Sequence, residues 1–356
     1  MLQYLQLMIL TLKSFCEDKM DKRKLRLSRL ITILLLFCSF AFFVVRGVGA
    51  LISMTTHNRV LEFIPDVYKS DDYKTLEGRS AEPVSGSEDT EFFPHYETAM
   101  AIGNDVESDN VILASVSENR VVAERGSTER MYPASMTKIM TLLVASESIP
   151  DLNQTFTMTY EITDPLYTQN ATVMGLLSGE TVPVIDLFYG AILPSGADAT
   201  AALAIIAAGS EENFVELMNE KAASLGLLDT HFMNTSGLHH EEHYTTAYDM
   251  ALILNAAMNN ELCRTVLTTE FYRTASTPEH PDGLELYSTM YQKKIRRDSI
   301  DGGVILGGKT GYTYEAGYCL ASIAEKNGRT YIAVTGGGDN KNSPKFDVEA
   351  LYSEYI

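Results

Sequence analysis

Two stretches of the chain show apolar positions alternating with polar ones, the period of a half-buried β-strand. In the first stretch the alternation is interrupted at Glu118-Asn119, and in the second at Asn327-Gly328. Asn-Gly is a favoured pair for the tight turn of a hairpin. The pattern predicts two β-hairpins, formed by residues 111–117 with 121–124 and by residues 320–324 with 331–334.

Between these hairpins the apolar residues recur every three or four positions, which is typical of amphipathic helices. Ser210 is placed to cap one of them, and Thr246 with Asp249 forms a capping box at the start of another. Strands at both ends with helices between them favour an α+β fold, in which an antiparallel sheet packs against a helical cluster. The predicted helices cover residues 136–148, 184–193, 198–208, 211–225 and 246–258, and a short amphipathic stretch follows at 346–355.

The N-terminal part has a different pattern. A cluster of lysines and arginines precedes an apolar run at 30–45, which Arg46 closes. This order is typical of an export signal or membrane anchor. The run is shorter than the roughly 20 residues that span a bilayer, but it extends to residue 52 if Arg46 reaches toward the headgroups.

We therefore predict a cytoplasmic basic segment at 1–29 and a membrane segment at 30–52, which favours an extracytoplasmic domain at the cell membrane. Within the first segment, Met20 is an alternative start, so that residues 1–19 would be extra. The membrane segment is a signal anchor or, if cleaved at Val48-Gly49-Ala50, a secretory signal, and the anchor is favoured.

Composition separates a spacer from a folded domain. Residues 53–97 are acidic and lack apolar periodicity, which indicates a solvated spacer, and we expect residues 98–356 to form the folded domain. With 45% apolar residues the chain can bury a large core. The formal net charge of -19 argues against a nucleic-acid partner, since phosphate binding needs clustered basic residues.

The first candidate for chemistry is the string Pro133-Ala134-Ser135-Met136-Thr137-Lys138. At the start of a helix, a serine and a lysine three residues apart share one face, so Ser135 and Lys138 can touch. A serine becomes a strong nucleophile when a base takes its proton. A lysine can be that base if burial and positive surroundings depress its pKa. The helix N-terminus would also offer N–H groups to an oxyanion.

A second hydroxyl lies in Leu193-Pro194-Ser195-Gly196, a turn between two predicted helices. Ser195 can relay a proton to a leaving amine. The alternative is an ordinary turn in which the serine caps the following helix. Sequence leaves both interpretations open.

The third element, Lys309-Thr310-Gly311-Tyr312, comes just before the second hairpin. Lys309 would supply a fixed positive charge for a substrate carboxylate, and Thr310 a hydroxyl for the same group. Gly311 would let the substrate backbone approach the strand closely.

With these three motifs in order, the chain resembles the low-molecular-mass penicillin-binding proteins that act as serine D-alanyl-D-alanine carboxypeptidases. The resemblance covers residues 98–340. It also rests on the phrases Gly175-Leu176, Gly179-Glu180, Leu187-Phe188-Tyr189-Gly190, Asn234-Thr235-Ser236-Gly237-Leu238, Ala247-Tyr248-Asp249-Met250-Ala251, Thr313 and Ala316-Gly317-Tyr318.

The resemblance implies the penicillin-recognising serine-transferase fold, shared with β-lactamases, and a set of roles. Ser135 would be the acylated nucleophile, Lys138 its base, Ser195 the relay and Lys309 the carboxylate anchor. Backbone N–H groups of Ser135 and Tyr312 would form the oxyanion hole. The implied substrate is a peptidoglycan stem peptide ending in D-Ala-D-Ala, β-lactams would be covalent inhibitors, and neither a cofactor nor a metal is implied.

One departure from the family pattern is Ala197, where an asparagine usually follows Ser-Gly. The lost amide would bind the substrate carbonyl and steady the lysine. A hydrogen bond of that kind contributes about 1 to 3 kcal/mol, so its loss would slow the enzyme without abolishing activity.

Three alternative functions remain open from the residues. His239, Glu242 and His243 match the metallopeptidase string H-x-x-E-H, although a polar loop is expected there instead of the helix that a zinc site needs. A β-lactamase would share two of the three motifs, and Ala197 would also suit a catalytically impaired wall-binding protein. Two further points stay open: whether Cys263 pairs with Cys319, and whether the enzyme serves wall maturation or glycopeptide resistance.

Overall fold

The computed structural model describes residues 99–356. The predicted basic segment, membrane segment and spacer therefore lie outside the described residues. Within 99–356, no helix is both long enough and apolar enough to cross a bilayer.

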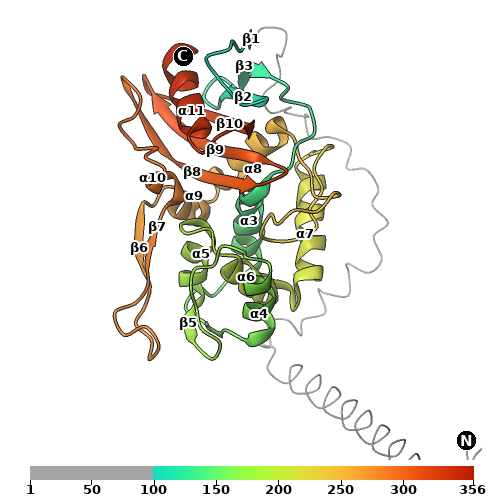
Figure 1. Ribbon diagram of the computed structural model, residues 1–356, viewed down its shortest axis with the longest axis vertical. Helices are drawn as coiled ribbons and strands as arrows, with labels where there is room; N and C mark the ends of the chain where they lie inside the picture. The colour runs from blue at the N-terminus through green and yellow to red at the C-terminus, as the bar shows by residue number, and fades with distance from the viewer. Residues whose placement is uncertain (1–98) are drawn as a thin grey trace, which may run out of the picture. The chain divides into compact units, whose positions relative to one another are not determined.

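A six-stranded sheet forms the centre of the domain (Figure 1). Its strands run in the order β1-β3-β2-β10-β9-β8, so that β8 lies at one edge. All neighbouring pairs are antiparallel except β1 with β3, where the short first strand is parallel. The strands are β1 (Met100–Ala101), β2 (Asn110–Ser115), β3 (Arg120–Arg125), β8 (Gly303–Thr313), β9 (Gly317–Lys326) and β10 (Arg329–Gly338).

Both predicted hairpins are confirmed. β9 and β10 pair around Asn327 and Gly328, whose φ angles of 53° and 72° are those of the tight hairpin turn that Asn-Gly favours. β2 and β3 pair around a turn in which Asn119 has φ of 49°. Local turn chemistry therefore sets the register of these strands.

The five predicted helices are also present, with their ends within one or two residues. Ser210 and Thr246 cap their helices through their side chains, as predicted. The pattern did not predict the strands β1 and β8, two small ribbons and three short helices. The helices are α3 (Lys138–Ser148), α4 (Tyr160–Thr168), α5 (Val184–Ile192), α6 (Ala197–Ala208), α7 (Glu211–Ser224), α8 (Ala247–Asn259), α9 (Glu261–Leu267), α10 (Thr289–Gln292) and α11 (Ser343–Glu354), and the ribbons pair β4 (Thr155–Thr157) with β5 (Thr181–Pro183) and β6 (Phe271–Arg273) with β7 (Glu285–Tyr287).

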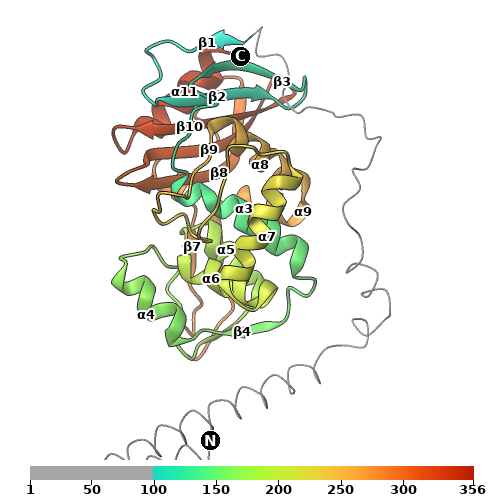
Figure 2. The ribbon, with the colours of Figure 1, turned by 90° about the vertical axis from the view of Figure 1, so that its right-hand side faces the viewer.

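The two faces of the sheet are covered differently. The C-terminal helix α11 packs on one face, and the helical cluster around α3 and α8 packs on the other (Figures 1 and 2). Two apolar cores result, one under α11 and a larger one between the sheet and the cluster. The α4 helix lies at the end of the cluster away from the sheet (Figure 2). This is the predicted α+β arrangement.

The possible disulfide is not formed. Cys263 and Cys319 are both free and buried. The Cys263 thiol lies 3.3 Å from the Ser146 hydroxyl, whereas the Cys319 thiol lies 3.5 Å from the Ala316 carbonyl. A disulfide requires the two sulfur atoms to be bonded at about 2 Å. Each thiol is instead packed against a different partner.

Candidate active site

Ser135 and Lys138 lie where a 3-10 turn continues into an α-helix. Ser135 lies in a single 3-10 turn, η4 (Ala134–Thr137), and Lys138 is the first residue of α3. The Lys138 Nζ donates a hydrogen bond to the Ser135 Oγ at 3.0 Å. The sequence predicted an α-helical start here. The tighter 3-10 turn still places the two side chains three residues apart on one face.

Lys138 is a buried amine with unusual surroundings. It is 2% exposed, and its Nζ also donates to the Ser236 carbonyl at 2.6 Å. Burial lowers the pKa of Lys138 to about 7, against the opposing charge of Asp198, which raises it. Because the ammonium form is disfavoured, a large fraction of this lysine is neutral at neutral pH. Such an amine can take a proton from Ser135.

The carbonyl that holds Lys138 belongs to the segment 233–237. Gly237 in this segment has φ of 80°, and a Cβ there would lie 1.8 Å from the Ala134 carbonyl oxygen. Only glycine permits this approach of the segment to η4. The Thr141 hydroxyl of α3 donates to the Thr235 carbonyl at 2.7 Å, one turn beyond Lys138. The segment 233–237 therefore forms one wall around the Lys138 amine. In the sequence this wall corresponds to the phrase 234–238, to which the residues alone assign no role.

Ser195 lies between α5 and α6 in a strained backbone conformation. Its φ of 71° is in the left-handed region, and its side chain is buried. The α6 helix is preceded by Gly196 as N-cap, and no side chain caps it. Ser195 is therefore not the capping residue of an ordinary turn. Within residues 99–356 its hydroxyl has no hydrogen-bond partner, which leaves it free for a substrate or a proton relay.

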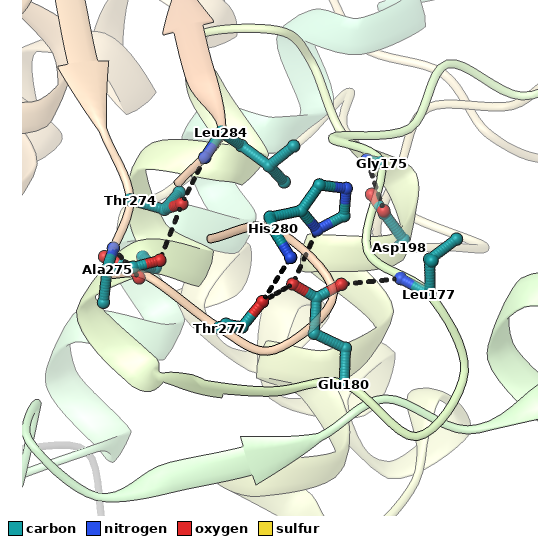
Figure 3. Close-up of polar contacts among 10 residues, drawn as sticks. Gly175, Leu177, Glu180, Asp198, Thr274, Ala275, Thr277, His280 and Leu284 are labelled. Carbon is teal, nitrogen blue, oxygen red and sulfur yellow. Dashed lines mark hydrogen bonds and ion pairs between the residues drawn. The ribbon is translucent and has the colours of Figure 1, made fainter. Parts of the chain in front are cut away.

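Ala197 and Asp198 begin α6 and are both buried. The Asp198 carboxylate accepts a backbone N–H bond from Met174 at 2.8 Å. It accepts a second one from Gly175 at 3.1 Å (Figure 3). Burial raises the pKa of Asp198 despite these bonds. The segment after Ser195 thus carries the charge that acts on Lys138. Ala197 has no amide to offer Lys138, whose Nζ donates to the Ser135 Oγ and to the Ser236 carbonyl.

The third motif lies on the edge strand β8, which packs against η4. A Cβ on Gly311 would lie 3.0 Å from the Pro133 carbonyl oxygen and 3.2 Å from the Ser135 nitrogen. The Thr310 hydroxyl donates to the Thr289 hydroxyl of α10 at 2.7 Å. Tyr312 is half exposed, and its ring stacks on that of Tyr318 with centroids 4.4 Å apart.

Lys309 is almost fully buried, and its Nζ donates to the Thr310 carbonyl at 2.9 Å. Burial lowers the pKa of Lys309 well below its usual range, and the charges of Lys138 and Lys293 lower it further. The predicted fixed positive charge is therefore costly in the free protein. A bound carboxylate would stabilise the ammonium form, because an opposite charge raises the pKa of a lysine.

The metallopeptidase string does not have the geometry of a metal site. His243 is 2% exposed, and both ring nitrogens are engaged, Nε2 with the Thr137 hydroxyl at 2.9 Å and Nδ1 with the Met233 N–H at 3.3 Å. His239 and Glu242 are exposed, whereas His243 is buried. In the part of the chain that the structure describes, no three His, Cys, Asp or Glu side chains are grouped to hold a metal. The loop that was expected here is present, since residues 232–246 contain no helix.

Comparison with known proteins identifies the family. The family model of D-alanyl-D-alanine carboxypeptidases matches residues 96–340. The chain belongs to this family. Its members are the proteins that the three motifs resemble.

Individual relatives of this carboxypeptidase family cover the same region. The D-alanyl-D-alanine carboxypeptidase DacF of Bacillus subtilis is 34% identical over 254 residues, which make up 70% of this chain and 63% of that protein. DacA of Escherichia coli is 33% identical over 243 residues, or 65% of this chain and 57% of that protein. The chain therefore spans about three fifths of the length of these relatives.

Solved structures of similar proteins share the fold. The DD-transpeptidase of Streptomyces K15 is 28% identical, with a TM-score of 0.62 over 68% of this chain and 94% of that one. A D-alanyl-D-alanine carboxypeptidase from Mycobacterium tuberculosis H37Rv is 26% identical, with a TM-score of 0.59 over 68% of this chain and 89% of that one. The fold of this family member is thus that of known DD-peptidases.

In this member of the carboxypeptidase family, the buried carboxylate of Glu180, which lies outside the three motifs, connects two loops through hydrogen bonds. Glu180 accepts hydrogen bonds from the Thr277 hydroxyl at 2.7 Å, from His280 Nδ1 at 2.8 Å and from the Leu177 N–H at 2.9 Å (Figure 3). Burial disfavours its charge, but these bonds outweigh burial and lower the pKa of Glu180. The ionised carboxylate therefore ties the β6–β7 connection to the segment that also contacts Asp198.

We expect Glu180→Gln to lower the free energy of unfolding by about 1 to 3 kcal/mol at pH 7, because an amide cannot accept all three bonds. A carboxyl whose folded pKa is depressed stabilises the protein above its unfolded pKa, near 4.5 for Glu180, and this contribution is lost as the pH falls. Chemical unfolding at pH 7 and at pH 3 should therefore show the deficit shrinking at pH 3. Glu279→Gln, an exposed change in the same loop, is the control and should be neutral. An equal deficit at both pH values would show that Glu180 does not stabilise the fold through its ionised carboxylate.

Proposed function

We propose that this chain is a serine D-alanyl-D-alanine carboxypeptidase that removes the terminal D-alanine from peptidoglycan stem peptides through an acyl-enzyme. The observation that carries the proposal is the hydrogen bond from Lys138 to Ser135 at 3.0 Å, made by a lysine whose pKa burial lowers to about 7. Family membership supports the same activity, and the names of the relatives supply the substrate class.

Acylation begins when neutral Lys138 takes the Ser135 proton and the serine oxygen attacks the carbonyl carbon of the penultimate D-alanine. The carbonyl oxygen becomes an oxyanion, which the backbone N–H groups of Ser135 and Tyr312 are proposed to bind. The tetrahedral intermediate then collapses. The C–N bond breaks, and the departing amine of D-alanine receives a proton from Lys138 directly or through the Ser195 hydroxyl.

Deacylation uses the same groups in reverse. Lys138, neutral again, takes a proton from water, and the resulting nucleophile attacks the acyl-serine carbonyl. Collapse returns the proton to Ser135 and releases the shortened peptide. β-Lactams enter the first half of this cycle, because their amide carbonyl can acylate Ser135, and they would then deacylate slowly.

The proposed binding mode runs along the exposed edge of the sheet. The strand β8 has β9 on one side only, so a peptide can lie beside its other edge. The C-terminal carboxylate would meet Lys309 and Thr310, while the close fit of Gly311 against Ser135 brings the scissile carbonyl to the nucleophile. Arrival of the carboxylate would also stabilise the charged form of Lys309.

In this proposal the enzyme works outside the cytoplasm, where its substrate lies, and residues 30–52 attach it to the cell membrane. The basic cluster followed by an apolar run supports this location. A role in cell-wall maturation and cell shape follows from trimming stem peptides. A role in glycopeptide resistance would follow if the substrates are precursors that end in D-alanine.

Two assays on the expressed protein test the proposal. Intact-mass spectrometry after incubation with benzylpenicillin should show a single penicilloyl adduct, which peptide mapping places on Ser135. A stem pentapeptide ending in D-Ala-D-Ala should release D-alanine, with and without EDTA. Absence of the adduct, its location on another serine, or loss of D-alanine release in EDTA would overturn the serine mechanism. A β-lactamase would instead turn over benzylpenicillin rapidly and leave the pentapeptide intact.

A further inference from the structure

His243 is a buried histidine that the mechanism above does not use. Its Nδ1 accepts a hydrogen bond from the Met233 N–H, so in the neutral ring the proton is on Nε2, which donates to the Thr137 Oγ1. The ring also packs edge-on against Phe232, with centroids 5.6 Å apart. Both polar atoms of the side chain are therefore used, and the ring has one orientation.

The two partners of His243 belong to the two walls around the catalytic lysine. Thr137 lies in the chain between Ser135 and Lys138, at the end of η4. Met233 begins the segment 233–237, whose Ser236 carbonyl accepts the second hydrogen bond of Lys138. The imidazole thus joins the wall that carries the nucleophile to the wall that holds the base.

We propose that His243 is a positioning residue for acylation, which holds the segment 233–237 against the η4–α3 junction and so keeps Lys138 in a closed pocket. This inference rests on the proposed function for its kinetic consequences. Gly237 and Thr141 bring the same two walls together elsewhere, but His243 alone among the described residues bonds to both Thr137 and Met233 through its side chain.

Electrostatics agree with a neutral ring in this position. Burial, followed by the charges of neighbouring histidines and Lys138, lowers the pKa of His243 to about 3, so the ring does not titrate in the working range. A pH dependence of acylation near 7 therefore reports on Lys138 and not on His243. The groups that act on His243 are His231, His240, His239 and Lys138. Those coupled to Lys138 are Asp198, Lys309 and His243 itself.

The physical consequence is a link between His243 and the basicity of Lys138. Burial is the largest cause of the lowered pKa of Lys138. If the two walls separate, water reaches the amine, and its pKa moves back toward the ordinary value. Without the imidazole, the rate of acylation should fall at pH 7 and recover at higher pH. A variant that was merely less stable would lose active protein without moving this pH midpoint.

Three substitutions at His243 separate its two hydrogen bonds. His243→Phe removes both and keeps a ring against Phe232. His243→Asn offers an oxygen to the Met233 N–H but does not reach Thr137, whereas His243→Gln offers an N–H to the Thr137 hydroxyl. Thr137→Val removes the acceptor with little change in volume. His240→Asn, in the exposed part of the same loop, is the control.

The measurement is the pH dependence of acylation by a fluorescent penicillin in the full chain, with active protein counted by adduct formation at saturation. We expect the midpoint to rise by on the order of one unit in His243→Phe and Thr137→Val. From a starting value of about 7 this corresponds to about a five-fold loss at pH 7 that disappears near pH 9. His243→Gln should stay closer to wild type than His243→Asn, and the double variant His243→Phe/Thr137→Val should be no worse than either single one.

A second readout separates failure of this inference from failure of the proposed function. NMR titration of the Lys138 side chain, assigned by comparison with Lys138→Arg, measures its pKa without any substrate. If the wild type forms no adduct, the proposed function fails, and this titration still decides the role of His243. Unchanged pKa values in folded His243→Phe and Thr137→Val would overturn the inference. If His243→Phe does not fold, Thr137→Val and His243→Asn decide in the same way.

Discussion

Ser135→Ala will remove both penicillin labelling and D-alanine release, and Lys138→Ala will reduce turnover almost as severely, by on the order of a thousand-fold or more. The double variant Ser135→Ala/Lys138→Ala will be scarcely slower than either single one. The reason is that the two side chains form one chemical unit, joined by a 3.0 Å hydrogen bond. The serine is not activated without the amine, and the amine has no nucleophile to activate without the serine.

Stability measurements must accompany these rates, because Lys138 is buried and its removal changes the pocket. Lys138→Met keeps most of the side-chain volume and should fold with a thermal midpoint close to that of the wild type, since it removes a desolvated amine. Thr141→Ser is a matched control on the next turn of α3, where the hydroxyl bond to Thr235 is preserved. It should retain nearly full activity.

If the losses in Ser135→Ala and Lys138→Ala were strictly additive in the double variant, the lysine would act independently of the serine. That result would contradict the claim that the two side chains act together. Near wild-type release of D-alanine by folded Ser135→Ala would contradict the entire mechanism. Residual acylation of Lys138→Met that rises steadily at high pH is compatible with it, since hydroxide can then replace the missing base.

Lys309→Met will weaken the use of peptides with a free C-terminal carboxylate by about 10- to 100-fold in kcat/KM, and it will affect the corresponding C-terminal amides far less. A hydrogen bond between charged groups contributes about 1.5 to 3 kcal/mol, and the amide lacks the charge. Methionine fills a buried space similar to that of lysine. Lys341→Met, an exposed change on the loop before α11, should alter neither substrate.

The comparison of acid and amide isolates the charge of Lys309 from its packing. Equal losses on the two substrates would assign the side chain to the structure of the pocket. The buried amine is also coupled to Lys138, because the charge of Lys138 lowers the pKa of Lys309. If this repulsion operates between the two amines, Lys309→Met should also shift the acylation midpoint of Lys138 to higher pH.

The sequence predicted the parts of the site that depend on local geometry. Ser135 and Lys138 share a face in any helical turn, so the contact between them followed from a spacing of three residues. The Asn327-Gly328 turn and the caps Ser210 and Thr246 are equally local, and the structure has all of them. These features depend on only a few adjacent residues.

The walls around Lys138 could not be predicted in this way. The Ser236 carbonyl and the imidazole of His243 come from positions about one hundred residues away in the chain. His243 stood in a string that matched a metal site, and only its burial between Thr137 and Met233 shows what the ring contacts. The spacing of residues within a loop does not show which distant part of the chain the loop packs against.

The sequence alone determined the two hairpins, five of the helices, the α+β class and the three motifs, because periodicity and short-range spacing specify which residues share a face. Tertiary structure alone decided how the motifs converge. The strand β8 reaches Ser135 because Gly311 permits close contact, and the pKa of Lys138 is lowered because distant segments exclude water from it. A lowered pKa is a property of desolvation and surrounding charge, and both exist only when segments far apart in the chain have packed together.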